Sequence, residues 1–135
     1  MNQKNIVITG GNRGIGNGLL KIFAEKHNVV ITVRDKEKGE QAIEELKGLD
    51  NILDYVVMDV DSNEMILNGR EEIKEKLGHV DLLINNAGIF IKEHDLQAIE
   101  TSDETILKTF NTNTLGVLRM CKSIVPIMPN GGRII

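Results

Sequence analysis

The sequence predicts an α/β protein in which helices cover both faces of a doubly wound, three-layer parallel sheet. Strand-like apolar runs and helix-like periodic segments alternate along its 135 residues, which is the pattern of a parallel sheet with crossover helices. A glycine-rich turn over residues 9–16 joins the first apolar run to the first periodic segment. The β-branched run 29–33 is typical of a strand covered on both faces. No linker or repeat interrupts the pattern, so we expect one domain over residues 1–135.

The first three predicted strands cover residues 6–8, 29–33 and 53–58, and each is followed by a periodic, helix-like segment. The second helix is expected over residues 36–47, ending at Gly48. The residues expected to face the core are Ile15, Leu19 and Phe23 in the first helix, Ala42, Ile43 and Leu46 in the second, and Ile66, Ile73 and Leu77 in the third, which Gly78 ends.

The second half predicts a fourth strand over residues 81–84, an irregular segment over 89–102, and a helix capped by Ser102 or Asp103. Pro126 and Pro129 end that helix, and two glycines lead into a fifth strand, where the sequence stops. The predicted sheet is therefore truncated at its fifth strand. The positions of the last helix expected to face the core are Phe110, Thr114, Val117, Cys121 and Ile124.

Composition excludes several classes of partner. The net charge of −4 argues against binding to nucleic acid or to an anionic membrane surface. A single cysteine, Cys121, rules out an intrachain disulfide and fits a reducing, cytoplasmic compartment. No apolar run is long enough for a transmembrane helix. His27, His79 and His94 have no cysteine or carboxylate at metal-ligand spacing, so we predict no metal site.

The turn between the first strand and the first helix has the composition of a phosphate-binding loop. Glycine accepts positive φ angles and lets the backbone approach a pyrophosphate, and the N-terminus of the following helix favours an anion. A purely structural turn is the alternative interpretation. The residues predicted to bind a dinucleotide here are Thr9, Gly10, Asn12, Arg13, Gly14, Ile15 and Gly16.

Two further motifs follow in order: Asn85-Asn86-Ala87-Gly88 after the fourth strand, and Asn113-Thr114-Leu115-Gly116 in the last helix. With the glycine-rich turn, they make the chain resemble the short-chain dehydrogenase/reductase family. Thr32-Val33-Arg34-Asp35 and Gly131-Gly132-Arg133-Ile134-Ile135 look most like the NADPH-dependent carbonyl reductases of that family. The resemblance implies a Rossmann-like fold, a nicotinamide cofactor and a small carbonyl substrate.

Cofactor choice depends on the end of the second strand, where acids favour NAD and basic residues favour NADP. Arg34 and Arg13 could pair the 2′-phosphate, so we predict NADPH, although Asp35 would meet the ribose of NAD if the strand ended slightly later. The resemblance implies that Asp59 and the N–H of Val60 bind adenine.

The asparagine motifs acquire roles through the resemblance. Asn85, Ala87 and Gly88 would lie along the ribose and nicotinamide, whereas Asn86 is expected to hold neighbouring strands together. Asn113 would bend its helix and bind a water of the catalytic proton relay, and Asn111 is expected to face solvent.

The chain departs from the family in one respect: no Tyr-x-x-x-Lys is present, and the single tyrosine, Tyr55, lies in the third strand. We therefore predict the cofactor-binding half of an enzyme that reduces aldehydes, ketones or quinones, inactive alone. A naturally short, non-catalytic nucleotide-binding or partner-binding protein and an NAD-linked alcohol dehydrogenase are the alternatives. Leu83, Ile84 and Ile134 are expected to be partly bare, which would favour self-association.

Overall fold

The computed structural model describes residues 2–91 and 98–135. Within these ranges, five strands form one sheet in the order β3-β2-β1-β4-β5, and every neighbouring pair is parallel. The predicted α/β fold with a doubly wound parallel sheet is confirmed. The strands are β1 (Asn5–Thr9), β2 (Asn28–Val33), β3 (Leu53–Val57), β4 (Leu82–Ile84) and β5 (Arg133–Ile134).

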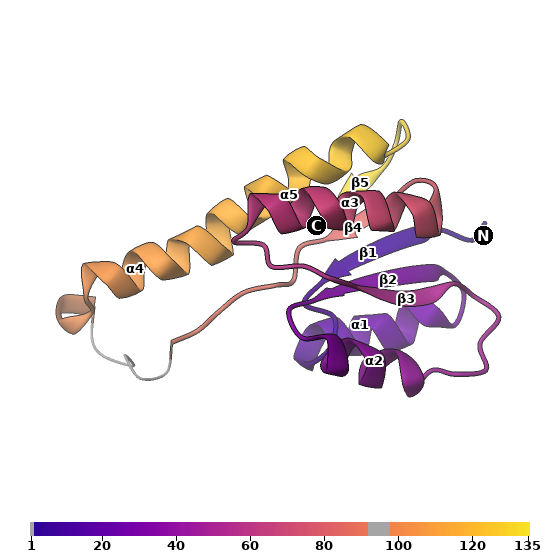
Figure 1. Ribbon diagram of the computed structural model, residues 1–135, viewed down its shortest axis with the longest axis horizontal. Coiled ribbons are helices and arrows are strands. Elements are labelled where there is room, and N and C mark those ends of the chain that lie inside the picture. The colour runs from indigo at the N-terminus through magenta and orange to yellow at the C-terminus, as the bar shows by residue number, and fades with distance from the viewer. Residues whose placement is uncertain (1, 92–97) are drawn as a thin grey trace.

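Helices cover both faces of the sheet (Figure 1). Alternate side chains of a strand point to opposite faces, so Ile6 and Ile8 of β1 join one apolar cluster while Val7 between them joins the other. The first cluster packs against α1 (Gly14–Ala24) and α2 (Lys36–Glu44), and the second against α3 (Asn63–Leu77) and α5 (Gly116–Ile124). The result is a three-layer domain.

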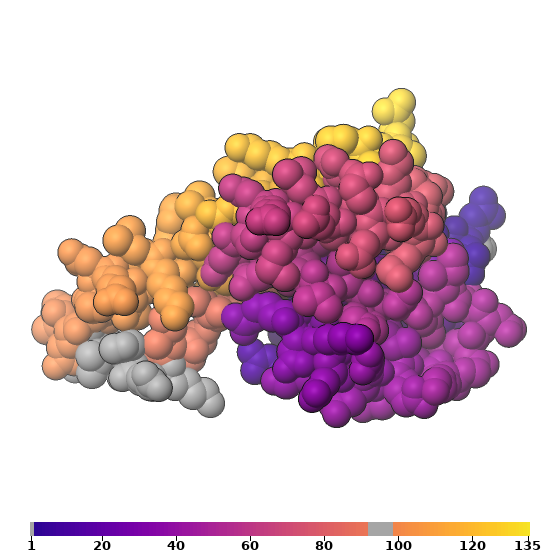
Figure 2. Space-filling model, in the orientation of Figure 1, coloured from indigo at the N-terminus to yellow at the C-terminus, as the bar shows by residue number. Residues whose placement is uncertain are grey.

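A long helical arm runs past the sheet. It consists of α4 (Asp103–Phe110), a π-helical turn (Asn111–Leu115) and α5, and α4 extends beyond the body formed by the sheet and its helices (Figures 1 and 2). The side chain of Ser102 accepts the backbone N–H of Thr105, so Ser102 is the N-cap of the arm. Short 3₁₀ turns over Ala98–Glu100 and Val125–Ile127 flank it.

The core-facing residues predicted for the first and the last helix are partly wrong. In α1 the buried residues are Gly16, Leu20 and Ala24; Leu19 and Phe23 are half-buried, and Ile15 is exposed. The face that packs on the sheet is therefore rotated by about one residue from the predicted stripe. The second helix also stops early, at Glu44 instead of Lys47, before a run of turns.

The last helix differs because of its π turn. The buried residues there are Thr112, Gly116, Met120, Ser123 and Ile124. A π turn contains an extra residue, so the apolar periodicity on its two sides does not share one face. Phe110 and Thr114, predicted to face the core, are exposed, and Val117 and Cys121 are half-buried.

The predicted exposure of the central sheet is also wrong for two residues. Leu83 and Ile84 are buried, because α3 and α5 cover one and α1 and α2 cover the other. Ile134 of the edge strand β5 is exposed, as expected. Association through the exposed sheet edge stays a prediction.

The sheet changes direction of growth at β1, which pairs with β2 on one side and with β4 on the other. The crossover connections that follow β1 and β4 lead to opposite sides of the sheet, so a crevice opens between the carboxyl ends of β1 and β4. The glycine-rich turn follows β1 at that edge, and the ends of β2, β3 and β4 lie beside it because all strands are parallel.

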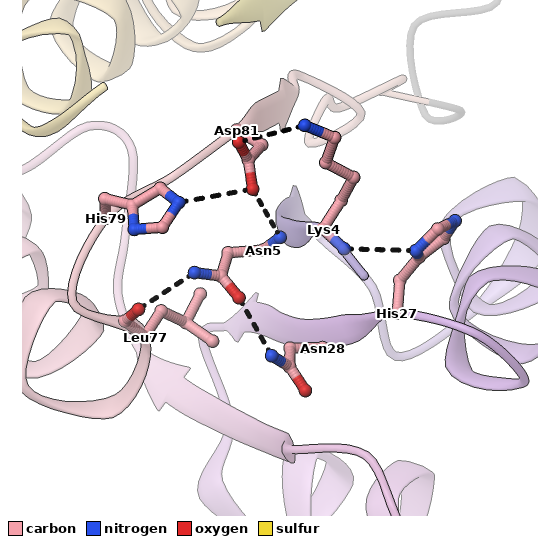
Figure 3. A network of polar contacts seen from close by, with 7 residues as sticks. All are labelled: Lys4, Asn5, His27, Asn28, Leu77, His79 and Asp81. Atoms are coloured by element: carbon pink, nitrogen blue, oxygen red, sulfur yellow. Dashed lines mark hydrogen bonds and ion pairs between the residues drawn. The ribbon is translucent and has the colours of Figure 1, made fainter. Parts of the chain in front are cut away.

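A polar network lies at the amino ends of the strands, on the side of the sheet opposite the crevice (Figure 3). The carboxylate of Asp81 accepts the backbone N–H of Asn5 at 2.9 Å and lies 3.5 Å from Lys4 Nζ and 3.4 Å from His79 Nε2. The side chain of Asn5 donates to the carbonyl of Leu77 at 2.9 Å. These contacts join the start of β1 to the end of α3 and the start of β4.

Asp81→Asn should lower the free energy of unfolding by roughly 1–3 kcal/mol at neutral pH, as expected for a hydrogen bond to a charged group. Burial raises the pKa of Asp81, but the hydrogen bond from Asn5 and the charges of Lys4 and His79 outweigh it and leave the pKa below its ordinary value. A lowered carboxyl pKa stabilises the fold above the unfolded-state value of about 3.9, and this contribution disappears as pH falls through the folded-state pKa. Urea unfolding from neutral to acid pH should therefore show the two proteins converging; a constant difference would contradict this role.

Candidate functional site

A cleft of about 420 Å³ lies at the carboxyl edge of the sheet, at the crevice beside β1. Such a volume is within the range of small-molecule and cofactor sites. Its wall comes from the glycine-rich turn, the ends of β2, β3 and β4, and the π turn. The lining residues are Gly10, Asn12, Arg13, Gly14, Ile15, Thr32, Val33, Arg34, Met58, Asp59, Val60, Asn86, Ala87, Gly88, Ile89 and Thr112.

The glycine-rich turn is bound to the neighbouring strand through its backbone. The carbonyl of Thr32 accepts the N–H of Gly10 at 2.9 Å and that of Gly11 at 3.3 Å. Gly14 has a φ of +54° and faces open space, since nothing lies within 4 Å of the position a Cβ would take. At Gly16 a Cβ would lie 2.5 Å from the carbonyl oxygen of Gly10. The turn thus needs glycine at 14 for its conformation and at 16 for close packing.

A reciprocal set of hydrogen bonds joins the ends of β1 and β4. Thr9 Oγ1 accepts the backbone N–H groups of Asn86 at 3.0 Å and Ala87 at 2.9 Å. The side-chain amide of Asn86 donates to the carbonyls of Thr9 at 3.0 Å and Gly10 at 3.1 Å. The prediction that Asn86 holds neighbouring strands together is confirmed.

The N-terminus of α1 opens on the cleft, which Arg13, Gly14 and Ile15 line. Arg13 precedes the helix without capping it through a side-chain hydrogen bond, and the first turn has no acidic residue. The first backbone N–H groups of a helix have no partner within the helix and favour an anion. This end of the cleft can therefore hold a phosphate group.

Arg34 and Asp35, which follow β2 directly, have different surroundings. Arg34 lines the cleft, whereas Asp35 is the N-cap of α2 and its Oδ1 accepts the backbone N–H groups of Glu37 at 2.9 Å and Lys38 at 3.4 Å. Arg13 lines the same cleft from the turn. The positive charges accordingly border the cavity, while the neighbouring carboxylate is engaged in capping a helix.

Four predicted site residues do not line the cleft: Thr9, Gly16, Asn85 and Asn113. Thr9 holds the segment after β4 through its hydroxyl, and Gly16 packs against the carbonyl of Gly10, which lines the cleft. The side chain of Asn85 donates to the carbonyl of Ile135 at 3.3 Å and lies 3.8 Å from Cys121 Sγ. Asn85 is therefore directed toward β5 and α5.

Asn113 acts on the cleft through its neighbour Ile89. Asn113 Oδ1 accepts the N–H of Ile89 at 2.8 Å, and its Nδ2 donates to the carbonyl of the same residue at 3.0 Å. Ile89 lines the cleft, so Asn113 fixes the course of the chain after β4. Asn111, expected to face solvent, is instead half-buried and accepts Arg119 Nη2 through its side chain at 2.6 Å.

Several residues that line the cleft were not predicted as site residues: Thr32, Val33, Met58, Ile89 and Thr112. Thr32 and Val33 are the two residues before Arg34, and Met58 directly precedes Asp59, so extending each strand-end motif backwards would have found them. Ile89 and Thr112 carry no such signal, because their place depends on the course of the chain after β4 and on the π turn.

Tyr55 lies in β3, as predicted, and its side chain packs in the cluster under α1 and α2. Its hydroxyl donates to Glu40 at 3.2 Å. Burial and this hydrogen bond raise its pKa above the ordinary value. Tyr55 does not line the cleft, so it is not placed to donate a proton there.

Within residues 2–91 and 98–135, no three His, Cys, Asp or Glu side chains are grouped to hold a metal ion. No helix in that same part of the chain is long and apolar enough to span a bilayer. His27 and His79 follow α1 and α3, and His94 lies outside the described ranges.

The comparisons with known proteins identify the family. The family model for short chain dehydrogenases matches residues 4–135, so the chain belongs to that family. It is 30% identical to human short-chain dehydrogenase/reductase 3 over 130 residues, which are 95% of this chain and 42% of that protein. It is also 30% identical to mouse carbonyl reductase [NADPH] 1 over 131 residues, 96% of this chain and 46% of that protein.

Solved structures agree in fold. The L-sorbose reductase from Gluconobacter frateurii complexed with NADPH and L-sorbose has a TM-score of 0.83 at 26% identity, covering 93% of this chain and 48% of that one. The 3-ketoacyl-(acyl-carrier-protein) reductase from Brucella melitensis complexed with NADH has a TM-score of 0.84 at 31% identity, covering 93% and 50%. The chain spans about half the length of the proteins it matches.

Gly14→Val should weaken dinucleotide binding by more than about tenfold, because a β-branched residue is a conformational outlier at positive φ and its side chain would enter the cleft. The far-ultraviolet circular dichroism should stay that of a folded α/β protein. Gly18→Ala is the matched control, since Gly18 lies in α1 and nothing is within 4 Å of its Cβ position. Calorimetric titration of both variants decides the matter; unchanged affinity in Gly14→Val would remove the turn from the binding site.

Proposed function

We propose that the cleft binds NADPH and that the chain forms the cofactor-binding part of a reductase acting on small carbonyl compounds. The observation that carries this proposal is the division of charge at the end of β2: Arg34 borders the cleft while Asp35 caps α2. Basic residues at this strand end favour a 2′-phosphate, whereas a free carboxylate would favour the ribose hydroxyls of NAD.

Each wall of the cleft would hold one part of the cofactor. Arg34 and Arg13 would pair the 2′-phosphate, and the backbone of the turn at Gly14 and Ile15 would hold the pyrophosphate. Asp59 keeps one carboxylate oxygen on the N–H of Asp61 at 2.9 Å, which orients the group at the end of β3. Its remaining acceptor capacity suits the amino group of adenine.

The nicotinamide half would lie over the small residues Ala87 and Gly88. When bound, NADPH supplies a hydride for transfer to a carbonyl carbon. The chain's own contribution at this end is positional: Asn113 holds Ile89 through two hydrogen bonds and so fixes the wall beside Gly88. The carbonyl class is supported by the name of the mouse relative, carbonyl reductase [NADPH] 1.

Arg34→Ala should cost roughly 1–3 kcal/mol of NADPH binding, the range for a hydrogen bond to a charged group, and leave NADH binding almost unchanged. Calorimetry with both cofactors measures the difference. Asp35→Ala is the control: a capping role predicts equal, small effects on both cofactors, whereas a selective loss of NADH binding would favour the NAD-linked alternative. Equal losses of both cofactors in Arg34→Ala would also refute the NADPH assignment.

The 135 residues alone should bind NADPH without reducing aldehydes, ketones or quinones. Proton delivery requires a positioned donor, and the single tyrosine is held by Glu40 on the side of the sheet that α1 and α2 cover. Absorbance of NADPH in the presence of a model quinone measures turnover. Binding without turnover is the expected result; turnover would show that another group of this chain donates the proton, and the absence of any nucleotide binding would favour the partner-binding alternative.

A further inference from the structure

The helical arm widens into a π turn where it passes the cleft. In that turn the N–H of Gly116 donates to the carbonyl of Asn111, five residues back. Turns of this kind interrupt the regular ladder of α-helical hydrogen bonds and are frequent at functional sites. Thr112, which lines the cleft, and Asn113, which holds Ile89, both lie in it.

The guanidinium group of Arg119 braces the π turn from the next turn of the arm. Its Nη1 donates to the carbonyl of Asn111 at 3.2 Å, and its Nη2 donates to the side-chain oxygen of the same residue at 2.6 Å. Only 21% of the Arg119 side chain is exposed. A planar group that makes two bonds to one residue fixes its orientation as well as its distance.

The same guanidinium reaches the loop after β3. Arg119 Nη1 also donates to the carbonyl of Val60 at 3.2 Å and lies 3.9 Å from Asp61 Oδ1. Asp61 in turn accepts the hydroxyl of Thr112 at 2.7 Å. Gly116 packs so closely on Val60 that a Cβ would lie 2.8 Å from its Cγ2. The arm and the loop are thus joined by polar bonds and by direct packing.

These contacts connect two walls of one cleft. Asp59 and Val60 line it from the end of β3, and Thr112 lines it from the arm. We propose that Arg119 is a positioning residue, which holds the π turn with Thr112 and Asn113 at a fixed distance from the loop with Asp59 and Val60. The inference rests on the proposed function only in taking the ligand of the cleft to be a dinucleotide.

The competing explanation is that Arg119 merely neutralises Asp61. The two explanations differ for lysine, which keeps the charge but lacks the planar fork. Arg119→Lys should therefore fail to restore the site if Arg119 positions the π turn. Arg119→Met removes both functions, and Lys122→Met is the matched control, because Lys122 is an exposed cation one turn further along α5.

The experiment titrates the unaltered chain and the three variants with NADPH by calorimetry, and records the side-chain amide signals of Asn113 by nuclear magnetic resonance. Arg119→Lys and Arg119→Met should bind roughly three- to thirtyfold more weakly, the range for residues that act through packed neighbours. Both should shift the Asn113 amide signals, and Lys122→Met should change neither readout.

Wild-type affinity with unshifted Asn113 signals in Arg119→Lys would overturn the positioning role and leave charge neutralisation as the explanation. If Arg119→Met does not fold, Arg119→Lys alone decides. If the unaltered chain binds no NADPH, the proposed function fails, and the Asn113 signals alone decide the positioning role: a shift in Arg119→Lys but not in Lys122→Met supports it, and no shift overturns it.

Discussion

The cleft depends on the hydrogen bonds that join the ends of β1 and β4. The chain leaves these two strands in opposite directions, so nothing in the covalent path keeps their ends together. Thr9 Oγ1 accepts two backbone N–H groups from the segment after β4, and the side-chain amide of Asn86 donates to the carbonyls of Thr9, the last residue of β1, and Gly10, the residue after it. Four bonds from two side chains thus hold the ends of β1 and β4 beside each other at the cleft.

Close packing behind this brace explains why the turn requires small residues. A Cβ on Gly16 would collide with both the Gly10 carbonyl and the Asn86 amide, and a Cβ on Gly10 would lie 3.1 Å from Cα of Ala87. The turn, the start of α1 and the Asn-Asn-Ala-Gly motif therefore form one packed unit. Gly14 differs from these positions because it borders open space, which leaves room for a ligand.

The sequence pattern predicted those features of the fold that depend on regular secondary structure. The order of strands and helices, the burial of both faces of β2 and the stop of α3 at Gly78 follow from composition and spacing, whereas the bracing role of Asn86 came from the resemblance to the family. The pattern failed where the structure departs from regular geometry. The extra residue in the π turn leaves Phe110 and Thr114 exposed, and a hydrogen bond from Arg119, in the same arm, holds the side chain of Asn111. Neither effect has a periodic signal, because each arises where the arm departs from regular α-helical spacing.

The proposed preference for NADPH depends on the residue at which α2 begins. Asp35 has the extended backbone of an N-cap, and its carboxylate accepts two N–H groups of the first turn. These two backbone N–H groups have no acceptor within the helix, so turning the carboxylate toward a ribose would remove the N-cap of α2. Arg34, one residue earlier, has no such duty in the helix and borders the cleft. The start of the helix thereby engages the acidic one of two adjacent residues and leaves the basic one at the cleft, and this is the physical ground for proposing NADPH.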